Sequence, residues 1–155
     1  MRSHCEGEVV AFDDRNIAWL PFGEFTGFTV SVCKVDVPQG TAEFLIRFEP
    51  NSRIQLHRHM CDTSTLVLSG EHRLYDPDGS IQDVREVGSY TFSPPGSPHR
   101  EGAGEQPSVV FYNLRSDQGP AFEFLNDDLS LLAPLGIADV DAFWQMQQQA
   151  AAATA

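Results

Sequence analysis

The sequence predicts an all-β domain, an antiparallel sandwich or barrel of many short strands, followed by one short C-terminal helix. Apolar and polar residues alternate from about Phe28 onward, which is the period of half-buried strands. Gly, Pro, Asn and Asp separate these segments at short intervals, which favours antiparallel turns over βαβ units. The chain has 155 residues, of which 41% are hydrophobic. This composition fits one domain with one core and excludes a disordered chain.

The alternation is clearest in residues 28–33 and 42–48. Further strand candidates are residues 53–59, 64–69, 72–76, 81–86, 89–93, 108–115 and 121–125. Turn signals lie between them at residues 38–40, 50–52, 69–70, 76–79 and 102–104.

The two ends of the chain lack this period of two. Residues 1–8 show no periodicity and are expected to form a flexible arm before a domain that spans residues 9–146. The helix is predicted from four apolar residues with helical spacing, and Asp139 is its expected N-cap: Ile137, Val140, Phe143 and Trp144. Residues 147–155 are of low complexity and are expected to fray.

Charge and cysteine content narrow the function classes. With 10 Lys and Arg against 22 Asp and Glu, the net charge is −12. Such a chain repels phosphate backbones and anionic lipids, so we expect no nucleic-acid or membrane partner. Three scattered cysteines without a C-x-x-C spacing, and no visible secretory signal, predict reduced thiols in a cytoplasmic protein.

The chemically informative segment runs from Asn51 to His99. On a strand, residues two apart point to the same side, so His57 and His59 can chelate one metal ion. His99 is the candidate third ligand, because the Pro- and Gly-containing turn at residues 93–98 presents it rigidly. Taken alone, the histidine pair is better explained as a polar outer strand face, with Ile54 and Leu56 toward the core.

The downstream spacing favours the metal site. Gly88, Pro94, Gly96 and His99 match G-x5-P-x-G-x2-H, the second motif of the cupin superfamily, and the histidine pair with Gly70 resembles the first motif. The chain is therefore similar to small microbial cupins. This resemblance implies a single-domain double-stranded β-helix, a jelly-roll barrel that holds a metal.

The first cupin motif departs from its usual form at two places. Asn51 replaces the opening glycine, and Thr63 or Ser64 stands where the usual glutamate ligand falls. Ala103 also replaces the final Asn of the second motif. We therefore expect three histidine ligands without a carboxylate, which leaves two or three coordination positions open for a chelating anionic oxygen ligand and O2.

Three-histidine cupins of this kind resemble the acetylacetone-cleaving (β-diketone) and dihydroxyacetophenone dioxygenases. The ending from Gly119 to Trp144 strengthens the likeness to the former. The resemblance implies that His57, His59 and His99 hold Fe(II), that the substrate binds as an enolate, and that O2 cleaves a C–C bond. Zn, Mn or Ni are alternative metals.

Several residues near the three histidines are candidates for supporting roles. Gln55 and Arg53 share the strand face of the histidines, so they are candidates for hydrogen bonding to a ligand and for neutralising an anionic substrate. Ser64 or Thr63 is a candidate for hydrogen bonding to a metal-bound water. Glu101 and Glu105 could supply a carboxylate, but their glycine-rich loop is expected to be exposed. His4 and His72 are expected to be solvated, and the apolar wall is expected from Tyr90, Phe92, Phe111 and Tyr112.

Two further functions remain open. One is a different metal-dependent cupin enzyme, a lyase or isomerase. The other is a non-catalytic metal-binding or sensor module, because residues 89–99 also resemble the zinc-binding cupin domain of ChrR-type anti-sigma factors. We also expect a homodimer or homotetramer. Ile54 and Leu56, on the face opposite the ligands, would need cover from another strand or from a second subunit, and the resemblance to small cupins, which usually form oligomers, favours the subunit.

Overall fold

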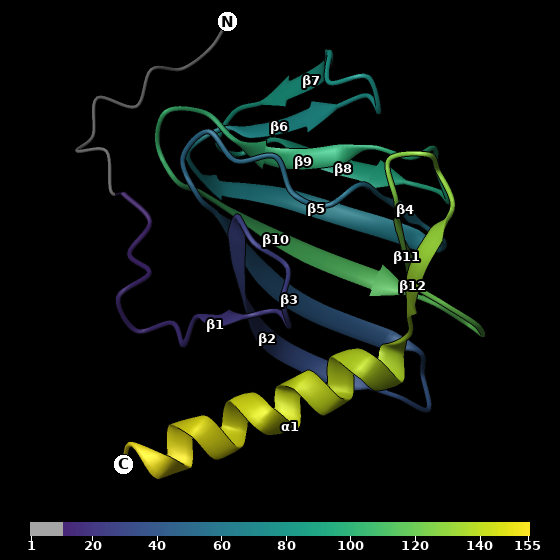
Figure 1. The fold of residues 1–155 in the computed structure, drawn as a ribbon. Helices are drawn as coiled ribbons and strands as arrows, with labels where there is room; N and C mark the ends of the chain where they lie inside the picture. The colour runs from purple at the N-terminus through teal and green to yellow at the C-terminus, as the bar shows by residue number, and fades with distance from the viewer. Residues whose placement is uncertain (1–10) are drawn as a thin grey trace, which may run out of the picture.

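Two facing layers of antiparallel strands form the body of the protein in the computed structural model, which describes residues 11–155 (Figure 1). One layer is a six-stranded sheet in the order β1-β2-β3-β10-β5-β8. Its strands are β1 (Leu20–Pro21), β2 (Phe28–Asp36), β3 (Thr41–Phe48), β5 (Asp62–Ser69), β8 (Tyr90–Ser93) and β10 (Ser108–Arg115).

The other layer consists of two three-stranded sheets. One has the order β12-β11-β4, from β4 (His57–His59), β11 (Phe122–Leu125) and β12 (Leu131–Leu135). The second has the order β7-β6-β9, from β6 (His72–Tyr75), β7 (Ile81–Arg85) and β9 (Arg100–Ala103). The predicted all-β fold with one C-terminal helix is confirmed.

The core lies between the layers because the inward positions of the long strands are apolar. Phe44 of β3 pairs with Tyr112 of β10, and their rings stack with centroids 5.2 Å apart. Phe48, Val110 and Leu114 are completely buried. Burial at every second residue is the pattern that the sequence alternation predicts.

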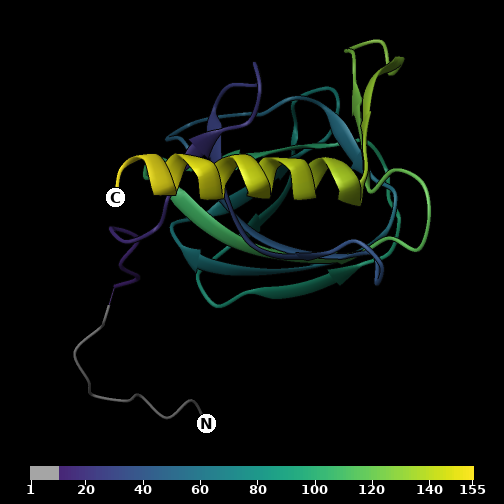
Figure 2. The same ribbon diagram turned by 90° about the horizontal axis from the view of Figure 1, so that it is seen from below.

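The C-terminal helix α1 (Ile137–Ala153) is longer than expected and continues through most of the segment that we expected to fray. It packs against β2 and lies along the open end of the strand layers (Figure 2). Its N-cap is Gly136 and not Asp139; Asp139 lies three residues into the helix and accepts a hydrogen bond of 2.7 Å from the Gly136 N–H.

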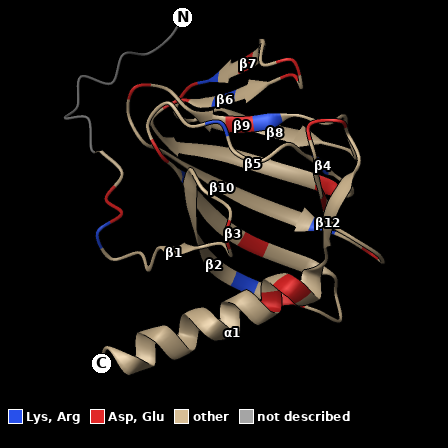
Figure 3. Ribbon diagram, viewed as in Figure 1, with Lys and Arg blue, Asp and Glu red and all other residues tan. Residues whose placement is uncertain are grey.

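The predicted arm at residues 1–8 lies outside the described residues, with His4 and Cys5. Cys33 and Cys61 are free thiols. Among residues 11–155, no helix is both long and apolar enough to cross a bilayer. Acidic residues are spread over the loops and the start of α1 (Figure 3).

Ile54 and Leu56 are 4% and 1% exposed within the single chain. Their cover therefore comes from within the chain, which is one of the two alternatives that we gave, and these residues supply no reason for a second subunit. The homodimer or homotetramer itself stays a prediction.

Candidate metal site

Two chain segments bring the three histidines together. The backbone N–H of His57 donates to the carbonyl of His99 at 3.0 Å, and the N–H of His99 donates back to the His57 carbonyl at 2.9 Å. This antiparallel bridge fixes the start of β4 beside the residue that precedes β9. His59, two residues along β4, then projects to the same side as His57.

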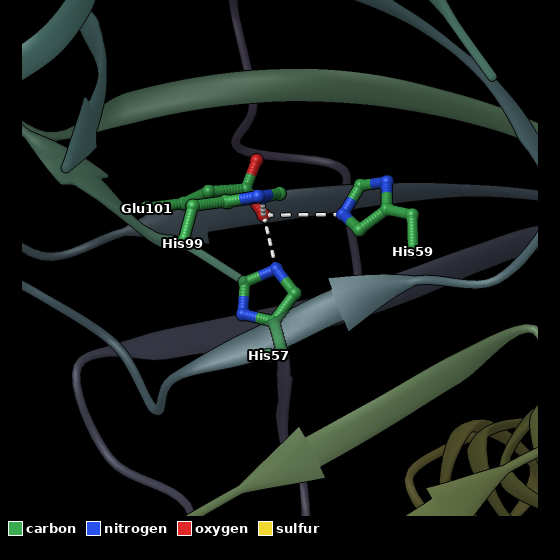
Figure 4. Close-up of side chains that lie close together, drawn as sticks. All are labelled: His57, His59, His99 and Glu101. Atoms are coloured by element: carbon green, nitrogen blue, oxygen red, sulfur yellow. Dashed lines mark hydrogen bonds and ion pairs between the residues drawn. The ribbon is translucent and has the colours of Figure 1, made fainter. Parts of the chain in front are cut away.

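The imidazole rings converge on one point (Figure 4). Ring centroids are 5.3 Å apart for His57 and His59, 4.7 Å for His57 and His99, and 5.0 Å for His59 and His99. One donor atom from each ring and one oxygen of Glu101 lie within 4.8 Å of one another. A single ion can contact four donors so arranged.

Hydrogen bonds set the orientation of two rings. Nδ1 of His57 donates to the backbone carbonyl of Gln55 at 2.8 Å, and Nδ1 of His99 donates to the carbonyl of Ser97 at 3.0 Å. With the proton on Nδ1, each Nε2 keeps its lone pair for a metal.

Buried nitrogen atoms support a metal at this point. Nε2 of His59 and Nε2 of His99 are buried and have no hydrogen-bond partner among the described residues. A buried polar atom without a partner costs about 1–3 kcal/mol, and a bound cation removes this cost. The donor set therefore fits a divalent transition metal, for which imidazole and carboxylate are ordinary ligands.

Glu101 is the fourth member of the candidate metal cluster, and its position differs from the one that the sequence predicted. We expected an exposed loop at this position and a site without a carboxylate, and both expectations are wrong. Glu101 lies in β9, is 3% exposed, and places Oε2 2.7 Å from Nε2 of His57. The signal was present in the spacing, because Glu101 follows His99 by two residues and so points to the same side once β9 forms. Glu105 is exposed, as expected.

Two further buried groups hold the other oxygen of Glu101. Its Oε1 accepts hydrogen bonds of 2.8 Å from Nε2 of His72 and 2.8 Å from the Tyr112 hydroxyl. His72 is completely buried, so the expectation of a solvated side chain is also wrong. One carboxylate thus joins the three-histidine cluster to a buried His–Tyr pair.

Burial and the shared carboxylate set the charge of the cluster. Burial lowers the pKa of His59 to about 4. Burial likewise opposes a charge on His99, but the negative charge of Glu101, whose Oε2 lies 3.8 Å from Nε2, outweighs it and raises the pKa of His99. Burial alone would raise the pKa of Glu101, yet its close contacts with the four surrounding histidines hold that pKa well below its usual value. Glu101 is therefore an anion and His59 a neutral ligand at neutral pH.

Glycine is required where β9 passes the chain before β4. A Cβ built on Gly102 would lie 1.8 Å from the carbonyl oxygen of Ser52. This close approach lets the Ile54 N–H donate to the Glu101 carbonyl at 2.9 Å, which holds Glu101 next to β4. Asn51 adopts φ 55° at the turn, in agreement with its place as a substitute for the first motif glycine.

Two cavities meet at the cluster. The first, of about 60 Å³, is apolar and lies between the layers beside α1. It is lined by His57, His59 and Glu101 together with aromatic residues that include Phe44, Tyr112, Phe122 and Phe143. The second, of about 190 Å³, is polar and lies on the side of β5, β7 and β8; it is lined by His59, His99, Glu101, Thr63 and Arg85, among others. A small molecule in either cavity would therefore lie next to an ion bound in the cluster.

Arg53 and Gln55 lie away from the cluster. Nη1 of Arg53 donates to the carbonyl of Gly79, and its guanidinium stacks over the Tyr75 ring at 4.3 Å. The side-chain amide of Gln55 donates to the carbonyl of Leu125. The reason is that β4 begins only at His57. Leu56 and His57 are both buried, so the alternation of inward and outward side chains does not extend back before His57. Gln55 contacts the site only through its backbone carbonyl.

Ser64 also points elsewhere, and its hydroxyl accepts a hydrogen bond of 3.1 Å from the Tyr90 hydroxyl. Thr63 is the buried member of that pair and lines the polar cavity. Of the four residues expected in the apolar wall, only Tyr112 lines either of these two cavities. Tyr90 and Phe92 are 65% and 61% exposed, because β8 is an edge strand whose apolar residues face outward.

Comparison with solved structures shows the same fold at low sequence identity. An RmlC-like cupin protein from Ralstonia eutropha gives a TM-score of 0.72 at 15% identity, covering 92% of this chain and 88% of that one. An acetylacetone dioxygenase from Acinetobacter johnsonii gives 0.69 at 19%, covering 95% and 97%. The DMSP lyase DddQ from Ruegeria pomeroyi gives 0.55 at 16%, covering 70% and 60%.

No curated protein gives a significant sequence match. The model of the ChrR cupin-like domain matches residues 7–116, which span most of the strands and all four residues of the cluster. The chain therefore belongs to the ChrR cupin-like domain family of cupins.

Proposed function

We propose that this protein is a mononuclear Fe(II)-dependent dioxygenase that cleaves a C–C bond of a small β-diketone or hydroxyketone. The observation that carries the proposal is the convergence of His57, His59, His99 and Glu101 on one point between two cavities. Four protein ligands on a six-coordinate ion leave two positions, which suffice for a substrate that chelates through two oxygens.

The bound ion would supply a Lewis acid that polarises the two substrate oxygens and so activates the carbon between them toward O2. The chain's own residues do the remaining work. Three neutral imidazoles and the Glu101 anion reduce the charge of a divalent ion to 1+, which favours an anionic substrate oxygen. The aromatic residues of the apolar cavity exclude water from the reacting carbon.

The full-length fold likeness to an acetylacetone dioxygenase supports the proposal, because its chain and this one cover each other almost end to end. At 19% identity that likeness concerns the fold. The choice of substrate therefore rests on the ligand set and must be tested directly.

The test is anaerobic reconstitution with Fe(II), followed by O2 uptake in the presence of pentane-2,4-dione and related diketones. We expect O2 consumption that depends on Fe(II) and on the diketone, and that is lost in Glu101→Gln but kept in Glu105→Gln. Turnover with zinc and not with iron would contradict a dioxygenase. Tight metal binding without turnover of any diketone or hydroxyketone would favour a metal sensor.

A redox-neutral lyase or isomerase is the second candidate. It is favoured by Glu101 itself, since a carboxylate added to three imidazoles suits Zn, Mn or Ni as well as Fe. The fold likeness to a DMSP lyase agrees with this candidate without deciding it. A lyase or isomerase of this kind is expected to convert its substrate in the strict absence of O2.

A further inference from the structure

The polar cavity contains a single arginine, Arg85, at the end of β7. Among the described residues that line this cavity, Arg85 is the only Lys or Arg and Glu101 the only acid. The remaining lining groups near the cluster are mostly uncharged and polar, namely Thr63, Thr65, Gln82, Ser93 and Ser97. The cavity thus presents one fixed positive charge and neutral hydrogen-bonding groups to whatever lies beside the cluster.

Two contacts orient the Arg85 guanidinium. Its Nε donates to the carboxylate of Asp83 at 2.8 Å, and its Nη1 donates to the Thr91 hydroxyl at 3.1 Å. The Thr91 hydroxyl is itself hydrogen bonded to that of Thr65 at 2.5 Å. The Arg85 side chain is 16% exposed, whereas that of Asp83 is 47% exposed and does not line the cavity. The arginine is therefore covered and positioned, with its partner acid toward the solvent.

Charge makes this cavity exceptional in a protein of net charge −12. A divalent ion with Glu101 carries 1+. Arg85 adds a covered guanidinium on the same cavity wall, whereas its partner carboxylate, Asp83, is 47% exposed and does not line the cavity, so solvent screens that negative charge more strongly. Charges interact more strongly in a partly enclosed cavity than in water, so this position attracts an anion that the rest of the surface repels.

We infer that the substrate is a small organic acid whose carboxylate bridges the metal and Arg85. One carboxylate oxygen and a neighbouring keto or hydroxyl oxygen would occupy the two open metal positions, while the second carboxylate oxygen accepts from the guanidinium. Arginine suits this task because its planar N–H groups match a carboxylate. The inference rests on the metal site of the proposed function, and it replaces one chelating carbonyl group of the proposed diketone or hydroxyketone by a carboxylate.

The test compares two ligands that differ in this one group. Acetoacetate and pentane-2,4-dione both chelate through two oxygens, but only acetoacetate has a carboxylate. Binding of each to the Zn(II)-loaded protein is measured by calorimetry, so that no turnover interferes. The variants are Arg85→Gln, Arg85→Lys and, as a matched control, Arg115→Gln, whose side chain is 69% exposed at the end of β10.

We expect Arg85→Gln to weaken acetoacetate binding by about 10-fold or more, the loss typical of a charged hydrogen bond. Pentane-2,4-dione binding and zinc content should not change, Arg85→Lys should give an intermediate loss, and Arg115→Gln should match the wild type. Equal acetoacetate affinities in wild type and Arg85→Gln, both loaded with zinc, overturn the inference and leave the metal site intact. Wild-type protein that binds no zinc overturns the metal site and the inference together.

If Arg85→Gln does not fold, Arg85→Lys decides the question, since it keeps the charge and loses the fork-shaped donor. An unchanged acetoacetate affinity in that variant contradicts the bridging carboxylate.

Discussion

Glu101 faces His72 with one carboxylate oxygen and the metal cluster with the other. Nε2 of His72 lies 2.8 Å from Oε1, and Nε2 of His57 lies 2.7 Å from Oε2. His72 is on β6, paired in register with Ala103 of β9, so the sheet β7-β6-β9 fixes the carboxylate from behind. The ligand is thus oriented by a buried histidine that does not itself reach the cluster.

This relationship predicts the effect of His72→Phe. Phenylalanine keeps the stacking of residue 72 on Phe48, whose ring centroid is 5.5 Å from that of His72. It removes the hydrogen bond to Glu101, so metal affinity should fall about 10- to 100-fold. Tyr112→Phe, which removes the other donor to Oε1, should act in the same direction. Competition against a chromogenic chelator measures both, and wild-type affinity in the two variants would show that Glu101 needs no support.

Glu101→Gln tests the carboxylate as a ligand. The amide keeps the shape of the side chain and loses its charge, so we expect a loss of metal affinity of at least about 10-fold, since an ionised ligand binds a cation more strongly than a neutral one. Glu105→Gln is the matched control, because Glu105 is an exposed glutamate four residues away. Equal metal affinities in the two variants would restrict the site to the three histidines.

Burial of His59 predicts a pH dependence for the metal-free protein. The pKa of His59 falls from an unfolded value of 6.5 to about 4 on folding. Between these values the unfolded state binds the extra proton, so the free energy of unfolding decreases as the pH is lowered from 6.5 to 4. The contribution approaches about 3 kcal/mol at the lower end, since one pKa unit is about 1.4 kcal/mol. The free energy of unfolding, measured by urea denaturation at several pH values in this range, should change less steeply with pH in His59→Gln than in the wild type. An equally steep pH dependence in the two proteins would contradict the prediction.

Because α1 extends past residue 147, the side chain of Gln147 contacts β2, and its removal is expected to lower stability. Its side-chain Oε1 accepts from the Val32 N–H at 2.8 Å, and its Nε2 donates to the Val32 carbonyl at 3.1 Å. Gln147→Ala leaves both groups of buried Val32 without a partner and should cost about 1–3 kcal/mol. Gln148→Ala changes the same residue type at an exposed helical position and should cost little. Chemical denaturation of both variants is the measurement, and equal stabilities would contradict this role.

The sequence alone predicted the features that follow from strand alternation and from motif spacing. Strand alternation predicted the layers. The resemblance of residues 88–99 to the second cupin motif, added to the H-x-H pair, predicted three converging histidine rings. The sequence was insufficient where tertiary contacts decide. Glu101 directly precedes Gly102 and Gly104, which predict a loop, yet pairing of β9 with β6 makes that segment a buried strand. Similarly, Gln147 holds the helix against β2 at a position that sequence complexity alone assigned to a fraying end.

The expectation that Arg53 and Gln55 share the strand face of His57 was wrong for a related reason. Alternation holds only while a strand continues, and β4 has three residues. Before it, backbone hydrogen bonds to Glu101 and Leu125 set the direction of each side chain, so Ile54, and not Gln55, lines the apolar cavity.

The central claim is that His57, His59, His99 and Glu101 bind one metal ion. Anomalous diffraction at the absorption edge of the reconstituted metal tests it most directly, on crystals of protein loaded with one equivalent of Fe(II) or Zn(II). The account predicts one peak per chain, about 2.0–2.2 Å from Nε2 of each of the three histidines and from Oε2 of Glu101. A peak elsewhere on the molecule, or none at the point where the rings converge, would contradict it.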